Sequence, residues 1–454
     1  MRVFFAVLIA RAARVFCRLV HRGGTGLPGR IALKICPDLL CRLSRETACV
    51  VVTGTNGKTT SCRMIEEGFR RAGLSYFSNR SGANLIEGIA TDFIMNSSLS
   101  GKCRKEFAVL EMDEFASREV CRQLQPRVIF VTNLFVDQVE RFGGVRGTHD
   151  AIALAISRAP SAVVVLNADD SVSSDLGRGI DNRVVTFGLE KGAFKGAYTG
   201  FNDAPACISC GEALAYDYRT FSHLGGFRCP GCGRSRPAAD YAVTDVLRSD
   251  LSGSSVELRS PEGKTVLDVN LPAMYNVYNA VGSYAAMIAM GIPAAVAAVA
   301  LASFQCGFGR MEAFSQLGKA GAHMVLIKNG AGCDQVLNFL TGVDEDFNLA
   351  FYLNNNVSDG VDISWLEDVS FESLSNSRVR HIWVSGMRRA ELYDRLLRAG
   401  FPADFLTLED DCAALISTLN ESPCPVFILP TYTGMMATRA EIVKQCGGEM
   451  YWET

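Results

Sequence analysis

The chain has 454 residues, with 45 Lys and Arg against 48 Asp and Glu, and a formal net charge of −3. This near-neutral balance argues against a nucleic-acid binder, and the length predicts two or three domains. The 16 cysteines are many for such a chain. Most are scattered singly in helical or apolar surroundings, which is typical of buried thiols in a reducing cytoplasm.

Residues 1–45 are expected to form an amphipathic helix and a loop. The apolar run from Val3 to Ala10 is too short to span a bilayer. Arginines recur at helical spacing and are predicted to put four cations on one face: Arg11, Arg14, Arg18 and Arg22. Two interpretations stay open. The helix attaches to anionic lipid, or it packs on the protein with a solvated basic face.

A phosphate-binding loop follows the first apolar strand. Residues 51–60 read V-V-T-G-T-N-G-K-T-T. Glycines let backbone N–H groups point inward, Lys58 can neutralise phosphate charge, and Thr59 offers a hydroxyl to Mg²⁺ at a helix start. A chance turn before a helix is the weaker alternative. The loop predicts ATP binding by seven residues: Gly54, Thr55, Asn56, Gly57, Lys58, Thr59 and Thr60.

Further strands end in polar residues, as expected at the ligand-binding edge of an α/β sheet. The run 107–110 ends at Glu111, with Asp113 and Glu114 just beyond, and the run 166–170 ends in N-A-D-D. Strands alternate with helical stretches from about 48 to 312, so a mainly parallel sheet covered by helices is predicted for 46–312. A second alternation predicts a smaller Rossmann-like domain over 313–454, with ATP between the two.

Four cysteines form two C-x₂-C pairs separated by eighteen residues: Cys207, Cys210, Cys229 and Cys232. Both pairs lie in Gly-rich turns, and the spacing is typical of a zinc ribbon. Because four thiolates leave no open coordination position, the Zn²⁺ would be structural. Disulfides or a redox pair are the weaker alternatives. We expect the ribbon to be an insertion at 203–237.

Taken in order, these segments resemble the Mur ligase superfamily over nearly the whole chain. Residues 271–280 resemble its L-P-G-x-x-N-x-x-N-A segment, which implies that Asn276 and Asn279 bind ATP, the first near the adenine. Residues 308–312 resemble its G-R-M-E turn, which implies that Arg310 reaches the phosphates. Glu111 matches the metal-binding glutamate of the ligases, with Asp113 and Glu114 as possible substitutes.

One position departs from the superfamily pattern. After the run 128–134 the typical Mur ligase has Asp-His, in which the His serves a second metal, and here Gln138 follows Asp137. A second Mg²⁺ therefore stays an open question.

Within the superfamily, the chain resembles the MurT subunits of lipid II isoglutaminyl synthase. Residues 326–332 resemble the V-K-N-P-x-G segment of that branch, with Gly330 in place of Pro. The segments D-G-V-D-I-S-W at 359–365, S-G-M-R at 385–388 and P-T-Y-T at 430–433 resemble further signatures. An inserted ribbon is also common there.

The resemblance implies an ATP-dependent amidation in cell-wall synthesis. A carboxylate attacks the γ-phosphate, which Lys58, Mg²⁺ and Arg310 neutralise, and the resulting acyl phosphate is displaced by ammonia. The substrate would be the D-glutamate α-carboxyl of lipid II at the membrane surface, giving D-isoglutamine. No glutaminase signature is found in this chain, so a glutamine amidotransferase subunit of the GatD type is implied as partner, in a heterodimer or larger complex.

By resemblance, Asp359 completes the Cys-His pair of that partner or orients ammonia, with Asp362 as the alternative. The plainer interpretation gives Asp359 and Gly360 to a turn and Asp362 to a helix cap.

Two other functions remain open: an amino-acid-adding ligase of the Mur or folylpolyglutamate type, or a nucleotide-binding subunit that only docks a glutaminase. The first should show a carbamylated-lysine motif and a D-Y-A-H segment, and neither is found in this sequence. The intact phosphate loop argues against the second.

Overall fold

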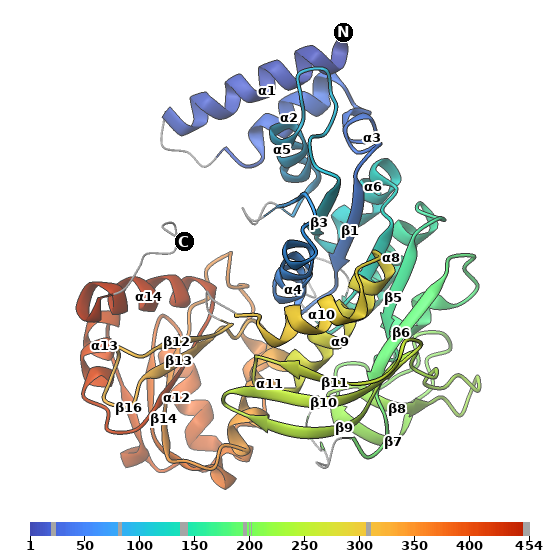
Figure 1. Cartoon of the computed structure of the whole chain (residues 1–454). Coiled ribbons are helices and arrows are strands. Elements are labelled where there is room, and N and C mark those ends of the chain that lie inside the picture. Colours follow the sequence, from blue (N-terminus) through green and yellow to red (C-terminus); the bar gives the residue numbers. More distant parts are fainter. Residues whose placement is uncertain are drawn as a thin grey trace.

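The structure is a computed structural model that describes residues 1–19, 24–79, 84–136, 144–193, 198, 200, 202–305 and 310–447. Its strands form a nine-stranded sheet, a six-stranded sheet and a two-stranded ribbon. Figure 1 shows the nine-stranded sheet with its helices as one body and the six-stranded sheet as a second body beside it. The α/β fold class predicted from the sequence is confirmed.

The nine-stranded sheet has the order β11-β10-β9-β6-β5-β4-β1-β3-β2. The strands from β2 to β9 in this order run parallel, and β10 pairs antiparallel with both β9 and β11. The middle strands β1 and β5 contain runs of valine. Such apolar runs are typical of parallel strands that are buried on both faces of a sheet. The bounds are β1 Ala48–Thr53, β2 Tyr76–Ser78, β3 Phe107–Glu111, β4 Val128–Val131, β5 Val163–Asn167, β6 Val184–Leu189, β9 Tyr241–Asp250, β10 Gly253–Ser260 and β11 Gly263–Val269.

Helices cover both faces of this sheet. One face packs on α4 (Lys58–Arg71), α9 (Met274–Ala289) and α10 (Ala294–Ala302). The opposite face packs on α5 (Ile86–Asn96), α6 (Glu114–Leu124) and α8 (Gly144–Ser157). Helix α9 lies so close to the sheet that a Cβ at Gly282 would come within 2.5 Å of the Phe130 ring. This close approach fixes the residues at the start of α9 relative to the strand ends.

The six-stranded sheet has the order β12-β13-β17-β14-β15-β16, with β12 antiparallel to the rest. It begins slightly before the boundary at 313 expected from the sequence. Two helices cover each face. The bounds are β12 Arg310–Phe314, β13 Ala322–Val325, β14 Phe347–Tyr352, β15 Val379–Ser385, β16 Leu406–Leu408, β17 Val426–Pro430, α11 Gly330–Thr341, α12 Arg389–Arg398, α13 Cys412–Asn420 and α14 Tyr432–Cys446.

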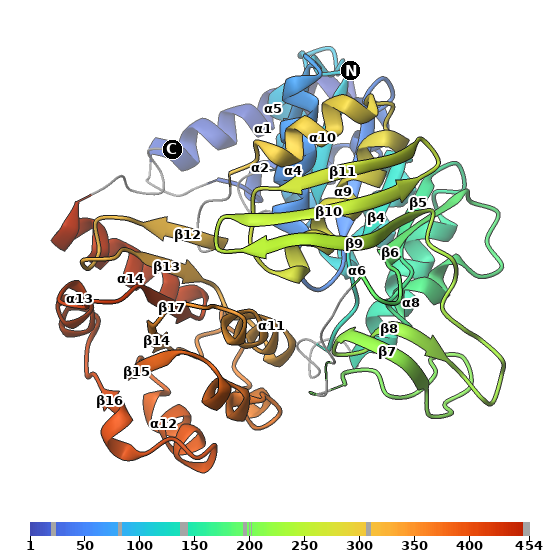
Figure 2. The same cartoon turned by 60° about the horizontal axis from the view of Figure 1, so that its bottom comes forward.

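Figure 2 shows α11 on the side of the six-stranded sheet that faces the central sheet. The ribbon of β7 (Ala215–Phe221) and β8 (Leu224–Arg228) contacts the turn after β5 through a bridge between Asp170 and Leu224. Short 3₁₀ turns complete the chain: η1 Ser173–Gly177, η2 Ser364–Glu367, η3 Phe371–Asn376 and η4 Ala403–Phe405.

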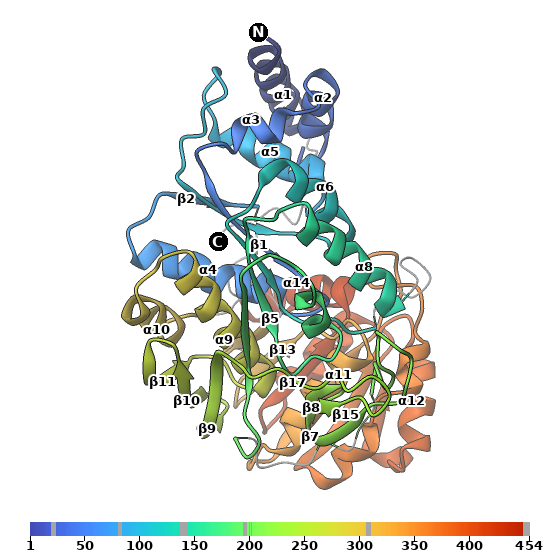
Figure 3. The same ribbon diagram turned by 90° about the vertical axis from the view of Figure 1, so that its right-hand side faces the viewer.

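Three helices precede the first strand: α1 (Arg2–Leu19), α2 (Leu27–Ile35) and α3 (Leu39–Leu43). Helix α2 crosses α5 at Gly29, where a Cβ would lie 1.8 Å from the Glu87 carbonyl oxygen. Helix α1 packs on α2 and α5, and Figures 1 and 3 show it at the outer end of the central domain. Within the residues described, no helix is long and apolar enough to cross a membrane.

Candidate nucleotide and partner sites

A cavity of about 420 Å³ lies between the two sheets. It is lined by the phosphate loop, by the end of β3, by the first turn of α9 and by Lys328 of the C-terminal domain. Most of the residues predicted to bind ATP or Mg²⁺ therefore meet in one place: Thr55, Asn56, Gly57, Lys58, Thr59, Thr60, Glu111, Asn276 and Asn279.

The loop between β1 and α4 depends on two glycines in the left-handed region. Gly54 has φ 119° and Gly57 has φ 83°. A Cβ at Gly57 would lie 2.2 Å from Asn279 Oδ1, and one at Gly54 would lie 2.5 Å from Thr132 Oγ1. Larger residues are excluded both by conformation and by space. The sequence predicted that the loop needs glycine for its backbone conformation. The lack of space for a side chain comes from the packing of α9 and the end of β4 against the loop.

Side chains after β4 hold the loop in place. Asn133 Oδ1 accepts a hydrogen bond from the Asn56 N–H at 2.9 Å, and Thr132 Oγ1 donates to the Asn56 carbonyl at 2.7 Å. From the C-terminal domain, Asn329 Nδ2 lies 3.5 Å from Asn56 Oδ1. Asn329 also caps α11, because its Oδ1 accepts from the Gly332 N–H at 2.8 Å. One residue therefore orients α11 and touches the phosphate loop.

The three acids near the end of β3 differ in their surroundings. Asp113 is the N-cap of α6 and accepts from two backbone N–H groups at 3.0 and 3.2 Å. Glu114 forms an ion pair with Lys58 at 2.8 Å, and both side chains are largely buried. Glu111 ends β3 and lines the cavity. Asp113 and Glu114 line the cavity as well, and the role of Glu111 as a Mg²⁺ ligand stays a prediction.

Both asparagines at the start of α9 are buried. Asn276 Nδ2 donates to the Pro272 carbonyl at 2.7 Å, and Asn279 Nδ2 donates to Asn276 Oδ1 at 3.4 Å. The preceding Ala273 has φ 74°, in a region that favours glycine. The resembled L-P-G segment has Gly at this position, so the unusual backbone shape is kept here despite the methyl group.

Two predicted positions cannot be placed. Gln138, where a second metal was in question, and the side chain of Arg310 lie outside the described residues. The role of Arg310 at the phosphates stays a prediction.

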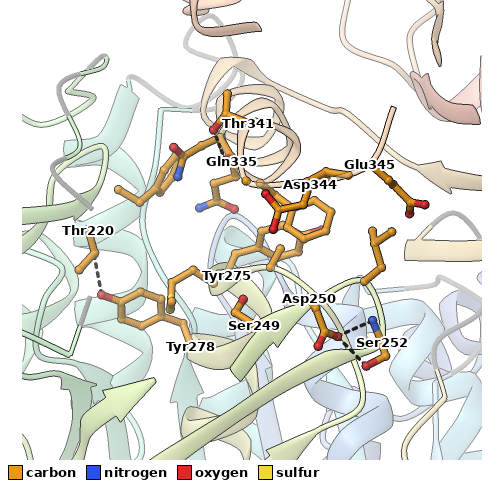
Figure 4. Close-up of a pocket in the computed structure, with 18 residues that line it drawn as sticks. Thr220, Ser249, Asp250, Ser252, Tyr275, Tyr278, Gln335, Thr341, Asp344 and Glu345 are labelled. Carbon is orange, nitrogen blue, oxygen red and sulfur yellow. Dashed lines mark hydrogen bonds between the residues drawn. The ribbon is translucent and has the colours of Figure 1, made fainter. Parts of the chain in front are cut away.

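Next to the nucleotide cavity lies a second cavity of about 720 Å³, between α11 and the turn joining β9 to β10 (Figure 4). Tyr275, Tyr278 and Gln335 line both cavities. The Tyr278 hydroxyl lies 2.7 Å from Thr220 Oγ1 at its wall. The two cavities are therefore continuous, and together they form a cleft between the domains. The second cavity extends this cleft from the start of α9 to the turn between β9 and β10.

The two acids of the N-A-D-D turn are fully buried and structural. Asp169 accepts from Tyr278 Oη at 2.6 Å, from Arg236 Nε at 2.7 Å and from the Leu189 N–H at 2.8 Å. The turn therefore joins β6, α9 and the C-terminal end of the 203–237 insertion, which contains Arg236. Tyr278 and Arg236 were missed in the sequence, because the pattern around each gives no sign of a buried carboxylate partner.

Asp170 is buried in the same way on the other side of the turn. It accepts from the Leu134 N–H at 2.7 Å and from His223 Nε2 at 3.0 Å. Burial raises the pKa of the Asp170 carboxyl, but the His223 imidazole and the backbone N–H donors outweigh burial and lower the pKa overall. A depressed pKa stabilises the fold at neutral pH, and this stability is lost as the pH falls through it.

The four cysteines of the ribbon converge, with their Sγ atoms within 4.8 Å of one another. Cys207 Sγ lies 3.7 Å from Cys232 Sγ, and Cys210 Sγ lies 3.4 Å from Cys229 Sγ. These separations are too long for disulfides. A tetrahedron with Zn–S bonds of about 2.3 Å has edges of about 3.8 Å. The four thiols therefore fit a closed zinc site, with the Gly211 and Gly233 N–H groups completing the two turns.

The residues that resembled MurT signatures gather at the carboxyl edge of the six-stranded sheet. Asp359 is 5% exposed. Its Oδ2 accepts from Thr433 Oγ1 at 2.6 Å and from the Asn356 N–H at 2.9 Å, and its Oδ1 accepts from the Thr433 N–H at 2.6 Å. Asp359 thus ties the loop after β14 to the start of α14.

Asp362 is exposed, and its Oδ1 accepts from the Ser364 N–H at 2.8 Å at the start of η2. The surface around both acids carries exposed apolar side chains: Val357, Val361, Met387 and Tyr432. Asp362 thus lies just before η2, whose N-cap is Ile363, and Asp359 has hydrogen-bond partners within the chain. Which of the two acts on a partner stays a prediction.

The two α/β domains with a phosphate loop at their junction define a ligase of the Mur type. Residues 52–205 match the Mur ligase middle domain, and residues 326–435 match the MurT ligase C-terminal family. The MurF ligase of Thermotoga maritima, solved in complex with ADP, has a similar fold with a TM-score of 0.63, at 13% identity over 92% of this chain and 84% of that one.

The more specific relatives are MurT subunits of lipid II isoglutaminyl synthase (glutamine-hydrolyzing). The subunit of Streptococcus pneumoniae R6 is 33% identical, covering 97% of this chain and 96% of its own length. That of Staphylococcus aureus COL is 31% identical, covering 96% of each. The chain belongs to the MurT family, and it is a ligase.

We predict that Tyr278→Phe lowers the free energy of unfolding by about 1–3 kcal/mol, because the buried Asp169 carboxylate loses a donor. The measurement is urea unfolding followed by fluorescence and circular dichroism. Tyr284→Phe is the matched control, since the Tyr284 ring is also buried in α9 and packs on Tyr241. Equal losses in the two variants would remove the carboxylate as the cause.

Proposed function

We propose that the protein is the synthetase subunit of a lipid II isoglutaminyl synthase, in which it amidates the D-glutamate α-carboxyl of lipid II to D-isoglutamine in peptidoglycan synthesis. The observation that carries the proposal is the single cavity shared by the phosphate loop, Glu111 and Lys328. The full-length similarity to MurT subunits supports the choice of substrate over that of an amino-acid-adding ligase.

ATP would lie with its phosphates on the loop 54–60 and its base toward Asn276 and Asn279. Backbone N–H groups at the start of α4 and the Lys58 ammonium favour bound phosphate. Lys58 is held by Glu114 at 2.8 Å in this structure, so the triphosphate would compete with Glu114 for the ammonium. Thr59 and Glu111 would hold Mg²⁺, which supplies charge neutralisation at the β- and γ-phosphates.

The reaction has two steps. A carboxylate oxygen of the substrate attacks the γ-phosphorus, ADP leaves, and an acyl phosphate forms. Ammonia then attacks the acyl carbon, phosphate leaves with the C–O electron pair, and loss of a proton gives the amide. Arg310 would stabilise the transferred phosphoryl group, as the resemblance implies.

Ammonia would come from a glutamine amidotransferase subunit of the GatD type. The relatives are named as subunits, which implies a complex. The exposed apolar side chains around Asp359 and Asp362 support this edge of the C-terminal domain as the docking surface. Asp359 would complete or orient the Cys-His pair of the partner, with Asp362 as the alternative.

The enzyme would act in the cytoplasm at the inner face of the plasma membrane, where its lipid-linked substrate lies.

The first test is an amidation assay with the purified chain, lipid II, ATP and Mg²⁺, read by mass spectrometry. We expect a loss of about 1 Da, the OH-to-NH₂ change, with high ammonium alone, and a need for the partner when glutamine is the donor. No mass change, or a gain equal to an amino acid, would refute the proposal.

Lys58→Met should lower the rate by about 10²-fold or more, because the positive charge that holds the transferred phosphoryl group is lost.

The second test separates Asp359 from Asp362. Asp359→Asn should lower glutamine-dependent amidation by about 10²-fold, because a neutral amide does not stabilise a charged imidazole, while ammonium-dependent amidation persists. Asp362→Asn and Thr433→Val are the controls, since the latter removes a hydrogen bond to Asp359 but keeps its charge. If only Asp362→Asn lowers the rate, the role belongs to Asp362.

The third test concerns the metal. The chain should bind about one Zn²⁺, and Cys232→Ser should lose it, because a closed site needs four thiolates. Metal content by mass spectrometry after gel filtration is the measurement. Cys41→Ser, at an exposed cysteine outside the ribbon, is the control and should keep the metal. Retention of zinc by Cys232→Ser would contradict the ligand set.

A further inference from the structure

Helix α1 presents its large apolar side chains to the outside. The residues that pack on the protein are small: Ala6, Val7, Ala10 and Cys17. Seven larger apolar side chains of the helix are between 41% and 74% exposed: Phe4, Phe5, Leu8, Ile9, Val15, Phe16 and Leu19. We call these seven residues the outer face of α1. Helix α1 packs on the protein, as one of the two sequence interpretations expected, but these apolar side chains occupy its exposed side, Arg11 points inward, and Arg22 lies outside the described residues.

The positions of the outer face follow from helical geometry. At 100° per residue, the seven side chains and Ala12 fall within one continuous sector of the helix, opposite Ala6 and Ala10. The sector extends along the whole helix, which at 18 residues is about 27 Å long. An apolar strip of this length on the surface of a monomer marks an interaction site.

The charge around the strip is positive. Helix α1 contains no acidic residue, and the exposed side chains of Arg2 and Arg18 lie near its two ends. Arg11 points inward, where its Nη2 donates to the Ile94 and Ser97 carbonyls and fixes α1 on α5. Residues 1–45 carry nine Lys and Arg and one acid, although the whole chain is slightly acidic. Arg2 and Arg18 are therefore the exposed cations that α1 itself places beside the apolar strip.

We propose that the outer face of α1 lies in the interface of an anionic lipid bilayer, parallel to the membrane plane. Apolar side chains enter the acyl boundary, and flanking arginines meet anionic headgroups, which is the arrangement of interfacial helices. The inference deepens the proposed function, since it names the surface that would bring the cleft to a lipid-linked substrate. It does not depend on catalysis.

The charge pattern favours lipid over a protein partner. Within α1 the strip is apolar along its length and the exposed charged side chains are arginines, which matches a uniform anionic surface, whereas protein interfaces have a mixed polar rim. Helix α1 also lies at the outer end of the central domain, where a flat surface can approach it (Figures 1 and 3).

The test is sedimentation of the full-length chain with vesicles of phosphatidylcholine containing phosphatidylglycerol, or of phosphatidylcholine alone. We expect binding to the anionic vesicles that weakens with salt. The variant Phe5→Ser/Leu8→Ser/Phe16→Ser should bind at least about tenfold more weakly, because each inserted side chain contributes apolar burial. Arg2→Gln/Arg18→Gln should weaken binding to anionic vesicles selectively.

The matched control is Leu247→Ser/Val266→Ser/Val299→Ser, at three apolar residues that are 53%, 52% and 51% exposed outside the N-terminal helices. It should bind vesicles like the unchanged chain. Equal binding by the two serine variants would overturn the proposal, as would a stable dimer in light scattering that only the α1 variant abolishes. Ammonium-dependent amidation of a water-soluble, lipid-free substrate analogue should be equal in all variants, so failure of membrane binding and failure of the proposed reaction are distinguishable.

Discussion

The nucleotide cleft depends on two adjacent buried carboxylates. Asp169 and Asp170 follow β5, and together they bind β6, α9, the strand end at Leu134 and the ribbon segment. Burying charge is costly unless each oxygen is paired, and here each acid has at least three partners. The position of α9 is fixed through Tyr278, and with it the two asparagines that face the phosphate loop. The geometry of the cleft is therefore set by a turn that lies behind it.

Polar and apolar contacts join the two domains in the part of the chain that the structure describes, and Ala331 of α11 packs in the core of the central domain. Asn329 reaches Asn56 of the phosphate loop, and Tyr198 Oη donates to Asp334 at 2.8 Å. At the start of α11, Gly330 backs onto Trp365, with a Cβ position 3.4 Å from its carbonyl oxygen. The segment 359–365 therefore runs from the proposed docking surface to Gly330, which is next to Asn329, the residue that contacts the phosphate loop.

Much of this arrangement could be predicted from the sequence. The loop 54–60, the parallel sheet and the cysteine spacing each carry a local chemical signature, so fold class and phosphate site were accessible. The partners of Asp169 and Asp170 were not, because Tyr278, His223 and Arg236 are distant in sequence and unremarkable in type. The orientation of α1 was also beyond the sequence. Periodicity shows that a helix is amphipathic, but it left open which side of α1 packs on the protein, and the small residues do so.

The ribbon would make the nucleotide cleft depend on the supply of zinc in the cell. His223 and Arg236 flank its second cysteine pair, and they contact the carboxylates that fix α9. Structural zinc contributes directly to the folding of such small segments. Scarcity of zinc, or oxidation of the exposed Cys210 and Cys232, would loosen the back of the cleft without touching a residue in it. The amidation proposed for this protein would then depend on the zinc and redox state of the cell.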